Sequence, residues 1–147
     1  MGVEFLATSW LTGFVNYATV HVHQTSNLVQ AQNFGSTRGA PSHKVNAGLR
    51  GEWENGLSAE TLVHFVSSAS YPVNPAYQFF GPTFGFTSPV NDVGSYTLLN
   101  MRGAYRFWHD RAEVAVSVFN ALNDRHKENP IGEIIGSRVM GWLTLRY

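Results

Sequence analysis

The chain has 147 residues, of which 44% are hydrophobic, 14% aromatic and only 14% charged, and its formal net charge is zero. A soluble domain carries about 25% charged residues, so this composition is poor in charge for a water-exposed surface. The neutral balance gives no electrostatic reason to expect nucleic-acid binding, and the lack of cysteine excludes a disulfide framework and a thiolate metal site.

The start of the chain does not read as an export signal. The segment "MGVEFLATSWLTGF" lacks a basic stretch and contains Glu4. No part of the sequence reaches the roughly 18 continuous apolar residues that a membrane helix needs. We therefore expect either a soluble cytoplasmic chain or a sequence whose beginning is missing.

A period of two in hydrophobicity dominates the chain and predicts seven β-strands. In chain order they cover Val3–Trp10, Gly13–His23, His43–Glu54, Leu57–Ser67, Ser95–Phe107, Ala112–Asn123 and Ser137–Tyr147. Tight turns are expected at 11–13, 55–56 and 109–110. Asn55-Gly56 is the strongest of these signals, because a type I′ hairpin turn needs positive φ at both central residues.

The other connections, at about 24–42, 68–94 and 124–136, are long and hold most of the Pro, Ser, Asn and Gln residues. Short and long connections therefore alternate, which places all short ones at one end of the sheet. An up-and-down transmembrane barrel has this asymmetry, with short periplasmic turns and long extracellular loops. A soluble Greek-key sandwich has no reason to sort its loops in this way. We predict an all-β fold, an antiparallel up-and-down transmembrane β-barrel fragment of about seven strands.

Each of the last five predicted strands has one uncharged, mainly apolar face, and the opposite face carries the charges. In the third strand, Val45 and Leu49 alternate with Lys44, Arg50 and Glu52. The last strand places Val139, Gly141, Leu143, Leu145 and Tyr147 on one face and Arg138 and Arg146 on the other. Lipid outside a barrel and a polar interior would require this division.

Aromatic residues lie at the ends of the strands that run toward the short turns: Trp10, Trp53, Phe107, Trp108 and Tyr147. Trp and Tyr favour the membrane–water interface, because the apolar ring and the polar group each meet a suitable medium. Ordinary core aromatics near strand ends are the alternative. Agreement at all four such strands favours a membrane-interface girdle.

Several segments resemble TonB-dependent outer-membrane receptors in order and spacing. They are "GVEFLATSWLTGFVNYA", "APSHKVNAGLRGEW", "NGLSAETLVHFV", "SYTLLNMRGAYRF" and "AEVAVSVFNALNDRH". The most specific pieces are "FNALNDRH" and the C-terminal aromatic residue that follows alternating apolar residues. The resemblance covers essentially the whole chain and only the C-terminal part of the family's barrel, so residues 1–147 are predicted to form one such portion.

The resemblance implies part of a receptor for TonB-dependent uptake of a scarce nutrient, such as an iron-siderophore, cobalamin or another metal complex. The implied place is the Gram-negative outer membrane, with the C-terminus on the periplasmic side. The implied partners are outer-membrane lipid, the remaining barrel strands, the plug domain and an unknown small-molecule ligand. The family's plug, TonB box and signal peptide do not occur in this sequence, so TonB would be reached only through a missing N-terminal part. We therefore expect a truncated or split receptor that is inactive alone.

The same resemblance assigns a second role to the end of the chain. Val139, Gly141, Leu143, Leu145 and Tyr147 would form the C-terminal signal that the outer-membrane assembly machinery reads. Removal of Tyr147 would then lower insertion in cells more than its burial alone suggests.

Candidate chemistry elsewhere is sparse. His21 and His23 share a strand face and could begin a metal site, but no third ligand lies near them in sequence, so we favour rim residues. Glu113 faces the same side as Arg102 and Arg106. These residues could touch a plug or an anionic substrate, and we favour cross-strand ion pairing. No nucleophile elbow or phosphate loop is present, so we expect no enzyme activity and no cofactor.

Two other classes of protein remain open. One is a stand-alone porin-like barrel formed by several copies of the chain. The other is a soluble β-barrel that binds a small ligand, against which the uncharged strand faces and one-sided loop lengths both argue.

Overall fold

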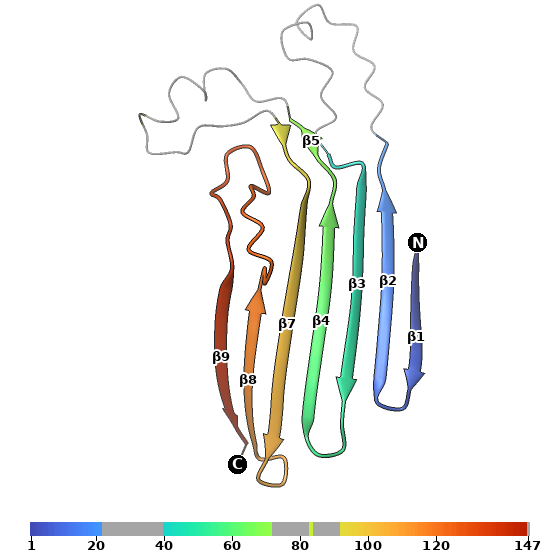
Figure 1. Cartoon of the computed structure of the whole chain (residues 1–147), viewed down its shortest axis with the longest axis vertical. Coiled ribbons are helices and arrows are strands. Elements are labelled where there is room, and N and C mark those ends of the chain that lie inside the picture. The colour runs from blue at the N-terminus through green and yellow to red at the C-terminus, as the bar shows by residue number, and fades with distance from the viewer. Residues whose placement is uncertain (22–39, 72–82, 84–91, 147) are drawn as a thin grey trace, which may run out of the picture.

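The computed structural model describes residues 1–21, 40–71, 83 and 92–146, and within them the fold is all-β without an α-helix. A seven-stranded antiparallel sheet has the order β1-β2-β3-β4-β7-β8-β9, and β5 pairs with β6 in a separate two-stranded sheet (Figure 1). The strands are β1 (Gly2–Thr8), β2 (Leu11–Thr19), β3 (His43–Glu52), β4 (Leu57–Val66), β5 (Ala69–Ser70), β6 (Asp92–Val93), β7 (Tyr96–Phe107), β8 (Ala112–Phe119) and β9 (Arg138–Leu145).

The seven predicted strands and their antiparallel order in the main sheet are confirmed, but β2 ends at Thr19 and β8 at Phe119, before the predicted ends at His23 and Asn123. The three short turns lie together at one end of the sheet, here called the short-turn end, and the strand ends joined by the longer connections lie opposite (Figure 1). The two short strands β5 and β6 were not predicted; they pair antiparallel within the connection expected over 68–94. The main sheet is open, with β1 and β9 at its two edges, and it does not close into a barrel.

The first turn lies earlier in the chain than predicted. Thr8 pairs with Leu11, so the turn contains Ser9 and Trp10, and residues 11–13 belong to β2. Gly13 sits inside the strand because the ring of Phe5, its partner on β1, lies over the space where a side chain would be. A glycine inside a strand often marks a place where another group approaches the backbone closely. At Gly13 that group is the cross-strand ring of Phe5, so this glycine does not indicate a turn.

The second turn contains Gly56 as predicted but has a different geometry. Only Gly56 has positive φ, at 87°, whereas a type I′ turn would also require it at Asn55. The amide of Gly56 donates to the Trp53 carbonyl at 3.1 Å, and Asn55 Oδ1 accepts from the Leu57 amide at 3.1 Å. Side-chain capping by Asn55 and one left-handed glycine therefore close the turn.

Gly56→Ala is expected to destabilise the protein, because a Cβ there would lie too close to the carbonyl oxygen of Arg106 on β7. A left-handed conformation also costs an L-residue about 1–2 kcal/mol. Urea unfolding in detergent should show a loss of at least that size. Gly94→Ala is the matched control, since a Cβ at Gly94 meets no atom within 4 Å, and an equal loss in both variants would contradict this explanation.

The third turn confirms the tight connection expected around His109. Trp108, His109 and Asp110 have positive φ of 56°, 52° and 62°, and the Arg111 amide donates to the Trp108 carbonyl at 3.1 Å. Three consecutive left-handed residues reverse the chain within one turn.

The main sheet is one layer deep, so most large apolar side chains stay accessible. The buried apolar residues of the described chain are Val66, Ala69, Val93, Tyr96, Ala104, Ala112 and Ala115. Four of these, Val66, Ala69, Val93 and Tyr96, line one small pocket; they come from the end of β4, from β5 and β6, and from the start of β7. No helix of the described residues is long and apolar enough to cross a membrane.

Candidate functional site

The strand register places the alternating apolar residues of all seven strands on the same side of the sheet, here called the uncharged face. One row of paired residues across it is Phe5, Gly13, Leu49, Thr61, Met101, Val118 and Val139. No Asp, Glu, Lys or Arg of the seven strands lies on this face. At its end opposite the short turns, the Tyr17 hydroxyl lies 2.7 Å from His43 Nδ1. Monomeric soluble proteins rarely expose an apolar surface that extends over so many strands.

The predicted girdle residues that the structure describes lie at the short-turn end. Trp10 and Trp53 come from different turns, and their rings stack with centroids 5.4 Å apart. Phe107 ends β7 and stacks on Tyr105 at 6.2 Å, while Trp108 begins the next turn and is 66% exposed. The structure thus brings four of the five residues to one end of the sheet, and Tyr147 lies outside the described residues.

The C-terminal strand presents its predicted signal residues on the uncharged face. Val139, Leu143 and Leu145 are 68%, 66% and 61% exposed, and Gly141 pairs with Val116 of β8. These side chains contact little protein on their outer side, so their alternation is not explained by an internal core.

The opposite side, here called the charged face, holds charges that alternate in sign across neighbouring strands. The next row of paired residues is Thr12, Arg50, Glu60, Arg102, Ser117 and Met140. Arg102 Nη2 donates to Glu113 Oε1 at 2.8 Å, which confirms the predicted cross-strand ion pair. Arg106 lies directly opposite Glu113 in the register, and Arg50 pairs with Glu52 along β3. The charges of this face are therefore close to others of opposite sign.

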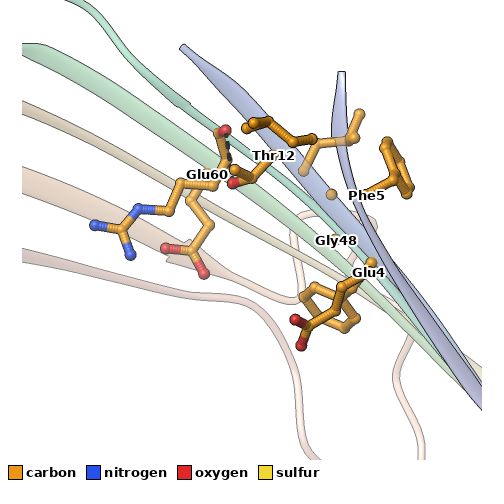
Figure 2. A pocket seen from close by; sticks show the side chains of 10 residues that line it. Glu4, Phe5, Thr12, Gly48 and Glu60 are labelled. Atoms are coloured by element: carbon orange, nitrogen blue, oxygen red, sulfur yellow. Dashed lines mark hydrogen bonds between the residues drawn. The ribbon is translucent and has the colours of Figure 1, made fainter. Parts of the chain in front are cut away.

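A hollow of about 550 Å³ lies beside β1 (Figure 2). Its lining comes from β1, β2, β3 and β4 and includes Glu4, Phe5 and Glu60. Its one hydrogen bond among the drawn residues joins Thr12 Oγ1 to the Arg50 carbonyl at 3.4 Å. The residues that line this hollow, from β1 to β4, include no nucleophile–base pair.

The segment after β8, which contains the "FNALNDRH" sequence, is fixed to the sheet by side-chain hydrogen bonds. Asn120 and Asn123 both have positive φ, at 52° and 51°. Asn120 Nδ2 donates to the Asp124 carbonyl at 2.9 Å, and the Asp124 amide donates to Asn120 Oδ1 at 3.0 Å. Asp124 Oδ2 then accepts from the amide of Thr97 on β7 at 2.9 Å. These residue types have a structural explanation, because Asn and Asp tolerate the left-handed region and bond to nearby backbone.

His126 lies in this segment, as predicted, but it is buried. Its ring stacks on Tyr96 with centroids 3.9 Å apart, and its Nδ1 donates to the Asp124 carbonyl at 2.6 Å. Its Nε2 has no hydrogen-bond partner and lies 3.8 Å from Glu128. Sequence reasoning missed this contact, since nothing local to residue 126 indicates an aromatic partner on β7.

No metal centre forms among the described residues, where no group of three His, Cys, Asp or Glu side chains converges. His21 follows β2, and His23 lies outside the described residues, so their pairing stays a hypothesis. His64 bonds to Asn46 on the neighbouring strand through its Nδ1.

The chain matches no protein-family model, no curated protein and no solved structure. The resemblance to TonB-dependent receptors therefore stays a prediction from the residue pattern.

Proposed function

We propose that the chain forms the C-terminal barrel wall of an outer-membrane receptor for TonB-dependent nutrient uptake, with its uncharged face in lipid and its charged face toward the lumen. The observation that carries this proposal is the continuous uncharged face, which ends in Trp and Phe side chains at the short-turn end. The short-turn end is then periplasmic, and the longer connections are extracellular.

Strand length supports the same assignment. A transmembrane β-strand needs about 9–11 residues when tilted by about 45°. The four strands β2, β3, β4 and β7 have 9, 10, 10 and 12 residues, while β8 and β9 have 8 each. The central strands are therefore long enough to cross the apolar part of a bilayer.

The proposed mechanism requires no covalent chemistry from this chain. Extracellular loops would capture a nutrient, a plug domain outside this sequence would open a path, and the present strands would supply the wall. The alternating positive and negative charges of Arg50, Glu60 and Arg102 would keep that wall hydrated. They would not create a strong electrostatic field that attracts either cationic or anionic ligands. On this proposal the chain does not transport alone.

Tryptophan quenching by a brominated detergent tests the proposal. In single-Trp variants of the full chain, Trp10 and Trp108 should be quenched several-fold more strongly by brominated dodecyl maltoside than Trp142. Trp142 lies on the charged face of β9, opposite Ala115, and is the matched control because it has a comparable exposure to Trp10, 41% against 43%. The physical reason is that detergent should cover only the uncharged face and its aromatic end.

Two outcomes would contradict the proposal. Equal quenching of Trp142 would show that detergent does not distinguish the two faces. Recovery of the unmodified chain as a monodisperse monomer in plain buffer would favour the soluble ligand-binding barrel, because an apolar face and two sheet edges would otherwise cause aggregation.

A further inference from the structure

Asn55 and Gly56 are the only Asn-Gly pair of the sequence, and they lie in the turn between β3 and β4. Asparagine is one of the thermolabile residues of proteins. Its side-chain amide can react with the backbone nitrogen of the next residue, and glycine there offers the least hindrance because it has no Cβ. Asn55 is exposed, so water reaches its amide. The pair is therefore a candidate site of covalent modification.

The reaction at this pair needs no reagent other than water. The Gly56 nitrogen loses its proton and bonds to the Asn55 Cγ carbon, the bond from Cγ to Nδ2 breaks, and the released nitrogen takes up the proton and leaves as ammonia. Water then opens the cyclic imide at one of its two carbonyl carbons. The products are aspartate, or isoaspartate with the backbone running through the former side chain. The net change converts an amide and water into a carboxylic acid and ammonia.

Hydrogen bonds of the closed turn hold both reacting groups. The Gly56 amide donates to the Trp53 carbonyl at 3.1 Å, and Asn55 Oδ1 accepts from the Leu57 amide at 3.1 Å. The first bond retains the proton that the Gly56 nitrogen has to lose. The second restricts the side-chain rotation that brings Cγ onto the Gly56 nitrogen. The closed turn therefore disfavours formation of the cyclic imide.

The packing of Gly56 opposes closure of the turn once isoaspartate has formed. The Gly56 carbonyl accepts from the Arg106 amide of β7 at 2.9 Å, and a Cβ at Gly56 would lie too close to the Arg106 carbonyl oxygen. Isoaspartate adds a methylene group to the backbone directly before this residue. A closely packed site has no free space for the longer chain. The modified turn therefore does not regain the same contacts.

We infer that Asn55 and Gly56 form a site of spontaneous deamidation that the closed turn protects, so that the acidic product accumulates in chains whose β3–β4 turn has opened. The opening is local, because the next backbone bond at this end of the hairpin joins the Trp53 amide to the Leu57 carbonyl at 2.9 Å. Local openings cost less free energy than global unfolding. The inference concerns the turn alone and does not depend on the proposed function.

Peptide mapping of the full chain measures the reaction. The chain is incubated at mildly alkaline pH, once folded in dodecyl maltoside and once unfolded in concentrated urea. A protease that cuts after glutamate releases residues 55–60, since Glu54 and Glu60 flank the site. Mass spectrometry then gives the acidic fraction of this peptide, and labelling by an isoaspartyl methyltransferase gives its isoaspartate content. The folded chain should react several-fold more slowly than the unfolded chain.

Leu57→Pro tests the hydrogen bond to the side chain of Asn55. The Arg106 amide bonds to the Gly56 carbonyl, so by alternation the Leu57 amide does not bond to β7, and the Trp53 carbonyl is taken by Gly56. Proline at 57 therefore removes the bond to Asn55 Oδ1 and no bond between strands. In the folded chain it should react several-fold faster than Leu57→Ala, the matched control that keeps the amide. In urea the two variants should react at the same rate.

Three outcomes would overturn the inference: a folded rate equal to or above the unfolded rate, equal rates for the two folded variants, or no acidic product at Asn55 in urea. If Leu57→Pro does not fold, a series of low urea concentrations on the unmodified chain takes its place. The rate should then rise with urea below the midpoint of global unfolding. A rate that stays constant up to global unfolding would also overturn the inference, because it would show that the turn does not open locally.

Discussion

Leu143→Arg should reduce the folded, detergent-inserted fraction of the protein far more than Thr144→Arg. Leu143 lies on the uncharged face, pairs with Val114 and is 66% exposed. An Arg on the lipid side of a barrel costs about 2–4 kcal/mol near the midplane and less toward the rim. Thr144 instead lies on the charged face directly opposite Glu113, so an Arg there gains a cross-strand partner.

Urea unfolding in dodecyl maltoside, read as heat-modifiable mobility, gives the measurement. Leu143→Gln is the matched control for charge, because it also removes apolar surface but adds no ion, and it should lie between the wild type and Leu143→Arg. Equal losses for the two arginine variants would contradict the assignment of faces. A larger loss for Thr144→Arg would reverse it.

Strand positions could be predicted from the sequence because side chains of a strand alternate between two environments. That alternation is local, so it is visible in segments such as 43–52 without knowledge of the neighbours. Turn positions were less predictable. Gly13 belongs to a strand because Phe5 covers it, and Asn55 caps a turn with only one left-handed residue; both facts depend on contacts outside the local pattern.

The candidate lipid-facing surface was predictable in part for the same reason. Within one strand, odd-numbered and even-numbered residues lie on opposite faces, so the sequence alone assigns each residue to a face. The register then shows that these faces coincide across the sheet. The Arg102–Glu113 pair could be predicted because the two strands are consecutive in the main sheet and share a short turn. The contact between Tyr96 and His126 could not, because it depends on how a long connection folds back onto β7.

Asn120→Ala should cause the second large loss of stability. Asn120 is 2% exposed, has a φ of 52° and exchanges two hydrogen bonds with the backbone of Asp124. Alanine leaves the part-buried Asp124 amide without its partner, and the full cost of such a loss is about 1–3 kcal/mol where the group is completely buried. It also places a residue that avoids the left-handed region at positive φ, for about 1–2 kcal/mol more.

Asn120→Gly separates these two contributions, because glycine adopts positive φ freely but supplies no hydrogen bond. Its loss in urea unfolding should be smaller than that of Asn120→Ala by about 1 kcal/mol. Asn123→Ala is the matched control, since Asn123 has a φ of 51° but is exposed and accepts one 3.2 Å bond from the Ser137 amide. Equal losses for Asn120→Ala and Asn123→Ala would mean that backbone conformation alone explains both asparagines. A larger loss at Asn120 that persists in the glycine variant would assign the remainder to its bonds with Asp124, which join the end of β8 to the start of β7 through Thr97.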